Sequence, residues 1–252
     1  MFATGLVSIS FREERPETIL REAAAAGLSG IEWGGDVHVP AGDLETARTV
    51  ARLTGDAGLR VFAYGSYYRL GTNADPAADF LPVLDTAEAL GAPLIRLWGG
   101  QKGSAALSTT ELEQMAGEMQ ILAEMAAKRR ITLTLECHAG TLTDEYAASL
   151  RFLNLVGRAN VRMYWQPNQF RSLAYNLEAA RALAPQTTHL HVFHWDAQNR
   201  YPLREGTADW RQYLTVFREA GGDHALLLEF MHDGRLSTLR ETAATLRDWL
   251  RP

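Results

Sequence analysis

The feature of this sequence that most restricts its fold is a repeated alternation of short apolar runs with longer amphipathic stretches. The predicted strands are Ala3–Ser8, Gly30–Trp33, Arg60–Tyr64, Leu94–Trp98, Thr132–Glu136, Arg162–Trp165, His189–Phe193 and Leu226–Glu229. The predicted helices lie near Pro16–Ala26, Leu44–Ala57, Pro76–Leu90, Thr109–Lys128, Asp144–Val156, Leu177–Leu183, Asp209–Ala220 and Thr238–Leu250. Strands that each precede a helix imply parallel strands joined by right-handed crossovers.

Eight such units in a chain of 252 residues fit a (β/α)8 TIM barrel, and we expect residues 1–252 to form one domain. The structural rival is a doubly wound open sheet, which usually carries a glycine-rich phosphate turn after its first strand. Residues Ser8–Arg15 contain no glycine, which favours the barrel. Because the active site of such a barrel lies at the C-terminal ends of its strands, the strand ends identify the candidate functional residues.

The stretch Thr188–Arg200, which reads THLHVFHWDAQNR, has an unusual concentration of polar candidates. Side chains alternate along a strand, so His189 and His191 would share one face just before the chain breaks into a polar loop. This pattern is typical of the wall of a site. For His189 alone, a core position satisfied by a backbone carbonyl is an equally good interpretation.

Two glutamates end predicted strands of the apolar kind that is normally buried. A carboxylate at such a place, as at Glu136 and Glu229, is costly unless it is paired, protonated or bound to a cation. Together with His191 and the amide of Gln166 they end consecutive strands, so a closed barrel would bring all four to one point. Oxygen and imidazole ligands of this kind suit Mn²⁺, Mg²⁺, Co²⁺ or Zn²⁺.

A different explanation for the buried glutamates is neutralisation by arginines, for which Arg96 and Arg200 are the nearest candidates. Cys137 is the only cysteine, so neither an internal disulfide nor a thiolate metal cluster can form. The choice therefore lies between ion pairs and a metal site.

At this point the residues resemble a known family, the xylose isomerase-like TIM barrels, a sugar isomerase and epimerase superfamily that also includes endonuclease IV. The resemblance covers essentially the whole chain and rests on the segments GLSGIEW, TLECHAG, HLHVFHWDAQNR and LLLEF. It implies that Glu136, His191 and Glu229 are metal ligands. It also implies that Arg200 is the substrate-facing arginine found in ketose 3-epimerases.

The chain departs from this family at two positions of strand six. The family normally has aspartate at the strand end and histidine three residues later, whereas this chain has Gln166 and Gln169. A glutamine carbonyl can bind a hard cation but carries no negative charge. The departure therefore predicts a metal held more weakly, and it removes a group that helps to orient substrate.

The leading functional hypothesis is a metal-dependent isomerase or epimerase that acts on a sugar, keto-sugar or related polyol through an enediolate intermediate. A cation bound by Glu136, Gln166, His191 and Glu229, with Mn²⁺ the first choice, would polarise a substrate carbonyl. One glutamate would remove the adjacent proton and the other would return it. Arg200 would stabilise the enediolate oxygen, and His138 would bind a hydroxyl or act as an auxiliary acid or base.

Several aromatic residues near the strand ends are consistent with a carbohydrate guest, because flat rings can stack on sugar C–H groups. For any one of them, ordinary packing is the better explanation; as a set they favour a polyol pocket. The predicted substrate-binding residues are Trp33, His38, Tyr64, Arg96, Trp98, Trp165, Gln169 and Trp195.

Three other functions remain open or are disfavoured. The same scaffold could support a dehydratase or lyase, and the two glutamines also suit a non-catalytic carbohydrate-binding protein. Net charge −5 and pI near 5.8 argue against nucleic acid, so endonuclease IV-like repair is a poor fit. No run approaches the ~18 apolar residues of a membrane span, so a soluble cytoplasmic protein is expected, and a homo-oligomer is compatible with the sequence.

Overall fold

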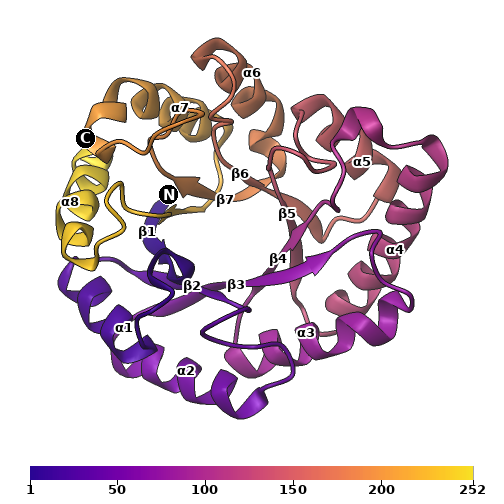
Figure 1. Ribbon diagram of the computed structural model, residues 1–252, viewed down its shortest axis with the longest axis horizontal. Coiled ribbons are helices and arrows are strands. Elements are labelled where there is room, and N and C mark those ends of the chain that lie inside the picture. Colours follow the sequence, from indigo (N-terminus) through magenta and orange to yellow (C-terminus); the bar gives the residue numbers. More distant parts are fainter. Residues whose placement is uncertain (252) are drawn as a thin grey trace.

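The computed structural model describes residues 1–251, and within them eight parallel strands close into a barrel in sequence order. The strands are β1 (Phe2–Val7), β2 (Gly30–Gly34), β3 (Arg60–Arg69), β4 (Leu94–Trp98), β5 (Thr132–Glu136), β6 (Val161–Trp165), β7 (Thr187–Val192) and β8 (His224–Leu228). Strand β1 pairs in parallel with both β2 and β8, which closes the ring. Figure 1 shows this ring of strands at the centre of the molecule. The predicted (β/α)8 barrel is confirmed.

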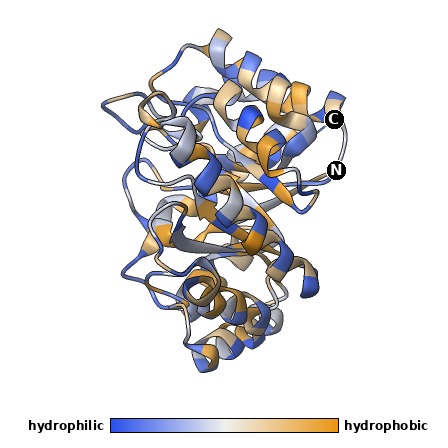
Figure 2. Cartoon of the chain, turned by 90° about the vertical axis from the view of Figure 1, so that its right-hand side faces the viewer, coloured by the Kyte–Doolittle hydropathy of each residue, from blue (hydrophilic) through white to orange (hydrophobic). Residues whose placement is uncertain are grey.

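Eight α-helices surround the barrel (Figure 1). They are α1 (Pro16–Ala25), α2 (Leu44–Asp56), α3 (Pro76–Leu90), α4 (Thr109–Lys128), α5 (Tyr146–Val156), α6 (Leu173–Leu183), α7 (Thr207–Ala220) and α8 (Leu239–Leu250). Figure 2 shows hydrophilic and hydrophobic residues alternating along the helices, as expected for helices that pack one face on a barrel. Among the helices, the largest boundary error concerns α6, which begins four residues before its predicted start because Ser172 caps it by accepting a hydrogen bond from the Tyr175 amide. Among the strands, β3 continues five residues beyond its predicted end at Tyr64.

The hydrophobic core lies in two places. The larger cluster fills the space between the strands and the helices, and it includes most of the buried leucines. A smaller cluster lies inside the barrel and contains Val7, Phe62, Tyr164 and Leu227. The barrel is therefore packed in its interior, and polar side chains gather where this packing ends, at the C-terminal ends of the strands.

Among residues 1–251, no helix is long and apolar enough to cross a membrane.

Candidate active site

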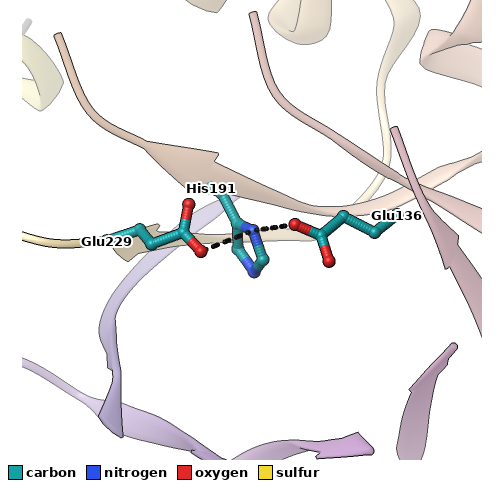
Figure 3. A group of neighbouring side chains, drawn as sticks. All are labelled: Glu136, His191 and Glu229. Atoms are coloured by element: carbon teal, nitrogen blue, oxygen red, sulfur yellow. Dashed lines mark ion pairs between the residues drawn. The ribbon is translucent and has the colours of Figure 1, made fainter. Parts of the chain in front are cut away.

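Four side chains from the last four strands meet at the C-terminal mouth of the barrel. Glu136 is the last residue of β5, His191 lies in β7, and Gln166 and Glu229 directly follow β6 and β8. Figure 3 shows the two carboxylates directed toward the His191 ring between them. The Nδ1 atom of His191 lies 3.0 Å from Gln166 Oε1, 3.5 Å from Glu136 Oε1 and 3.6 Å from Glu229 Oε1.

The geometry of this group fits a divalent cation. One ligand atom from each of Glu136, His191 and Glu229 lies within 4.8 Å of the others, and all three residues are buried. Ligand atoms about 2.0–2.2 Å from an ion are about 2.8–3.6 Å apart at octahedral or tetrahedral angles. The distances around Nδ1 fall in this range. The residues that could hold a metal are therefore these three, with Gln166 as a neutral oxygen ligand.

A buried arginine and a further glutamate adjoin this group. Arg96 Nε donates to Glu32 Oε1 at 2.7 Å, and Arg96 Nη1 donates to Glu136 Oε2 at 2.6 Å. Glu32 Oε2 lies 3.3 Å from His191 Nε2. Gly65 makes room for these side chains, because a Cβ atom there would lie 2.6 Å from Glu32 Oε1. Three carboxylates against one guanidinium leave a net charge of −2 before the imidazole is counted, which a divalent cation balances.

Glu32 is the site residue that sequence reasoning missed. It is fully buried and belongs to the apolar strand β2, where it faces the barrel interior. The signal was present in the segment GIEW, because a carboxylate inside an apolar strand needs a partner for the same reason as Glu136 and Glu229 do.

The two glutamate ligands differ in electrostatic environment. Burial alone would raise the pKa of Glu136, but the positive charge of Arg96 and the hydrogen bond and charge of His191 together outweigh it and hold that pKa at about 2. For Glu229, burial raises the pKa to about 7. Burial would lower the pKa of His191, whereas the carboxylates of Glu229 and Glu32 raise it to about 10. A cation must displace that imidazole proton, so metal binding should release protons.

The ion-pair explanation of the glutamates applies to only one of them. Glu136 pairs with Arg96, whereas within residues 1–251 no arginine lies at ion-pair distance from Glu229. Arg96 itself is 1% exposed, and it directs two of its nitrogens at carboxylates. The structure therefore places Arg96 behind the ligand cluster and not in the substrate pocket that the sequence suggested.

Trp33 and Trp165 have their side chains mainly in the core between barrel and helices, although Trp165 also lines a small cavity with His138 and Gln169. Each follows an inward-facing residue on its strand, so each points outward into the helix layer. Trp33 Nε1 donates to Thr54 Oγ1 of α2 at 3.1 Å, and Trp165 packs against Trp210 and Phe217 of α7. Both side chains belong to the core between barrel and helices.

Tyr64 and His38 are likewise held in structural contacts. The Tyr64 hydroxyl donates to the carbonyl of Val39 at 2.9 Å, and the ring is buried. His38 is 5% exposed, with Nδ1 2.9 Å from Ser8 Oγ and Nε2 3.2 Å from the carbonyl of Glu14. These contacts fix the loop after β2, and neither residue is placed to touch a substrate at the metal ligands.

Three other predicted residues lie at the mouth of the barrel. Trp98 and His138 are partly buried, with ring centroids 4.5 Å apart. His138, Gln166 and Gln169 line a small cavity of about 30 Å³ together with Trp165 and residues of α5 and α6, and Gln166 is the candidate ligand that borders it. His138 Nδ1 lies 2.8 Å from the carbonyl of Ala139 and must donate to it, which leaves Nε2 free to accept a hydrogen bond.

Trp195 and Arg200 lie together in the loop that follows β7. The Arg200 guanidinium lies 4.8 Å from the Trp195 ring centroid and 4.6 Å from that of Phe230. Phe230 directly follows Glu229 and has a positive φ of 46°. Trp195 and Gln169 share a further pocket of about 150 Å³. Arg200 is exposed, and no carboxylate of residues 1–251 lies within ion-pair distance of it, so its guanidinium is available to a ligand.

His189 is a core residue, in agreement with the more conservative interpretation of its position. Its ring packs edge-on against Phe62 and Tyr164 inside the barrel. Its Nδ1 lies 2.8 Å from the carbonyl of Thr188, the kind of backbone partner expected, and 3.1 Å from the Ala225 amide nitrogen. Burial lowers the pKa of His189 to about 4, so the ring is neutral at ordinary pH.

The sequence model of a family described as the xylose isomerase-like TIM barrel matches residues 20–252. The chain belongs to this family, as the sequence motifs predicted. A curated relative, a 3-dehydroshikimate dehydratase from Bacillus anthracis, is 26% identical over 262 aligned positions, and the match covers 91% of this chain and 91% of that protein.

Solved structures share the fold at low sequence identity. A crystal structure described as a probable 3-DHS dehydratase from Bacillus anthracis has a TM-score of 0.81 at 21% identity, covering 98% of this chain and 99% of that one. A xylose isomerase domain protein from Alicyclobacillus acidocaldarius has a TM-score of 0.79 at 15% identity, covering 99% and 98%. A D-psicose 3-epimerase from Clostridium cellulolyticum has a TM-score of 0.71 at 13% identity, covering 98% and 97%.

Proposed function

We propose that this protein is a divalent-metal-dependent isomerase or epimerase that moves a proton next to the carbonyl group of a sugar, keto-sugar or related polyol. The observation that carries the proposal is the convergence of Glu136, His191 and Glu229 on one buried point with net negative charge around it. Carboxylate and imidazole ligands of this kind suit Mn²⁺, with Mg²⁺, Co²⁺ and Zn²⁺ as alternatives. When bound, such an ion supplies Lewis-acid polarisation of a substrate carbonyl.

Glu229 is the better placed of the two glutamates to transfer a proton. Arg96 holds one oxygen of Glu136, so that side chain is fixed as a ligand. Glu229 is 7% exposed and has no arginine partner in the described chain, so its carboxylate can take a proton from the substrate and return it. The deeply buried position also excludes water from this step.

The residues around the mouth supply orientation. His138 and Gln169 follow β5 and β6 and carry polar atoms that are suited to substrate hydroxyl groups. Trp98 and Trp195 offer apolar surface on either side of the opening, against which C–H groups can pack. Arg200 lies at the rim next to Glu229 and can stabilise the oxyanion that develops as the proton leaves.

A second candidate function is dehydration of a related cyclic or open-chain polyol. It is favoured by the dehydratase relative, which is 26% identical along 91% of this chain. Dehydration begins with the same removal of a proton next to a carbonyl, and Glu229 could then protonate the departing hydroxyl. The two functions therefore share every residue role and differ only in the fate of the substrate.

The test is a metal titration followed by an exchange assay in D₂O. Protein freed of metal by chelation is titrated with each ion during thermal unfolding, where an ion at ~100 times its dissociation constant should stabilise the fold by ~2.7 kcal/mol. The loaded protein is then incubated with ketohexoses and with 3-dehydroshikimate. We expect metal-dependent deuterium incorporation next to the carbonyl. Product with retained hydroxyls supports isomerisation or epimerisation, and loss of water supports the dehydratase. No bound ion and no exchange would favour a carbohydrate-binding protein.

Gln166→Asp is expected to tighten Mn²⁺ binding about tenfold or more, because it adds a negative charge to the ligand set at short range. Gln166→Glu gives the same charge at the native side-chain length. The measurement is isothermal titration calorimetry, with Gln169→Glu as the control, since it adds the same charge beside the cavity but away from His191 Nδ1. Unchanged affinity in both Gln166 variants would mean that this residue does not bind the ion.

A further inference from the structure

We propose that Glu32 is a positioning residue that holds His191 in the tautomer whose Nδ1 lone pair faces the ligand cluster, with Arg96 linking it to Glu136. The inference rests on the proposed metal-dependent function, and it assigns a task to a buried carboxylate that the ligand set itself does not use. Its basis is the different surroundings of the two ring nitrogens of His191.

The two nitrogens of His191 face groups from different sides of the barrel. Nε2 faces a single atom, Glu32 Oε2 from β2, at 3.3 Å. Nδ1 faces oxygens that belong to the ends of β5, β6 and β8, at 3.0–3.6 Å. A neutral imidazole carries one hydrogen. With a cation bound by Glu136, His191 and Glu229, the Nδ1 lone pair is given to the ion, so the single hydrogen must be on Nε2, where Glu32 Oε2 accepts it. A hydrogen on Nδ1 would instead point at the cation position.

Because both groups are buried, Glu32 keeps its place as the acceptor for His191 Nε2. Its relative exposure is 0% and that of His191 is 1%, so solvent has no access to replace the carboxylate as acceptor. A carboxylate that accepts from the second nitrogen of a metal-binding histidine fixes both the ring orientation and its tautomer. Glu32 is thus placed to act on the ion through His191.

Arg96 connects the Glu32 carboxylate to Glu136, a second candidate ligand. Its Nε donates to Glu32 Oε1 at 2.7 Å while its Nη1 donates to Glu136 Oε2 at 2.6 Å. The planar guanidinium fixes the angle between its two partners. The chain His191–Glu32–Arg96–Glu136 therefore orients two ligands from outside the ligand cluster.

The test is Glu32→Gln, with Mn²⁺ affinity as the readout. Glutamate accepts from Arg96 Nε and His191 Nε2 at once, whereas glutamine has one acceptor oxygen, so its NH₂ group must face one of these donors. We expect Mn²⁺ to bind about 10–100-fold more weakly. The matched control is Glu118→Gln, which alters a buried carboxylate that accepts from Tyr68, Gly71 and Asn73 far from the ligands. It should leave Mn²⁺ affinity unchanged.

A second readout is the Nε2–H proton of His191 in the Zn²⁺-loaded protein, followed by ¹⁵N-edited NMR. The native protein should show a slowly exchanging Nε2–H signal that is lost or strongly shifted in Glu32→Gln. If that variant does not fold, Glu32→Asp serves instead, since it keeps the charge but is too short to reach both donors. Native Mn²⁺ affinity with an unchanged Nε2–H signal would overturn the positioning role alone. Failure of the native protein to bind any divalent ion would overturn the proposed function as well.

Discussion

Replacing Arg96 with leucine is expected to destabilise the protein by about 3–5 kcal/mol, because it leaves Glu32 and Glu136 as uncompensated buried charges. Solvent cannot reach these carboxylates, which are 0% and 4% exposed. Urea denaturation gives the free energy of unfolding directly.

The matched control for this substitution is Arg129→Leu. Arg129 also contacts two carboxylates, those of Asp85 and Glu88, but all three side chains reach solvent. Removing it should cost about 0–1 kcal/mol, since exposed ion pairs contribute little. If both variants lose the same small amount of stability, the buried network does not hold the barrel mouth together.

Glu229→Gln is expected to lower turnover about 10²–10⁴-fold at saturating Mn²⁺, because the amide cannot accept the substrate proton. The loss of stability should be small compared with that of Arg96→Leu, since no arginine depends on Glu229 within the described residues. Glu136→Gln should abolish turnover for a different reason, because it removes a candidate metal ligand that Arg96 orients. Deuterium exchange at the substrate carbon and Mn²⁺ affinity, measured on the same samples, distinguish the two effects.

Glu118→Gln is the control for both glutamate variants and should retain native kinetics. Native turnover in Glu229→Gln would mean that Glu229 does not transfer the proton. Native turnover in both Glu136→Gln and Glu229→Gln would contradict the proposed mechanism altogether.

The neutral residue at position 166 raises the question of how a metal is held. Gln166 Oε1 lies 3.0 Å from His191 Nδ1, so its amide keeps the place that an aspartate would occupy. Glu32 adds a carboxylate to the surroundings, so three carboxylates against Arg96 leave a net charge of −2 once His191 has given up its proton to bind an ion. The charge that attracts a divalent ion therefore does not depend on position 166 alone.

Strand order and the location of the site followed from local sequence patterns. The alternation of apolar runs and amphipathic stretches is a local property, and it predicted the barrel because eight repeats leave few other ways to bury so many parallel strands. The same reasoning placed Glu136, His191 and Glu229 at neighbouring strand ends, where closure of the barrel brings them together.

The aromatic residues show where local patterns were insufficient. Glu32 and Trp33 are neighbours on one strand, as are Tyr164 and Trp165, so the members of each pair face opposite sides. The sequence shows that they differ in direction. Which side is the interior depends on register, and a register shift between β2 and β3 at Ile31/Glu32 is one determinant that the sequence does not show.

The sequence by itself determined the barrel, its order of elements and the residue types of the candidate ligands, because these follow from the period of the pattern and the residues at strand ends. Only the tertiary structure decided which charges meet. Arg96 pairs with Glu32 and Glu136, residues 64 and 40 positions away, and not with a substrate. The physical reason is that an ion pair inside a barrel forms between side chains from separate strands. The distance between those side chains is set by closure of the sheet.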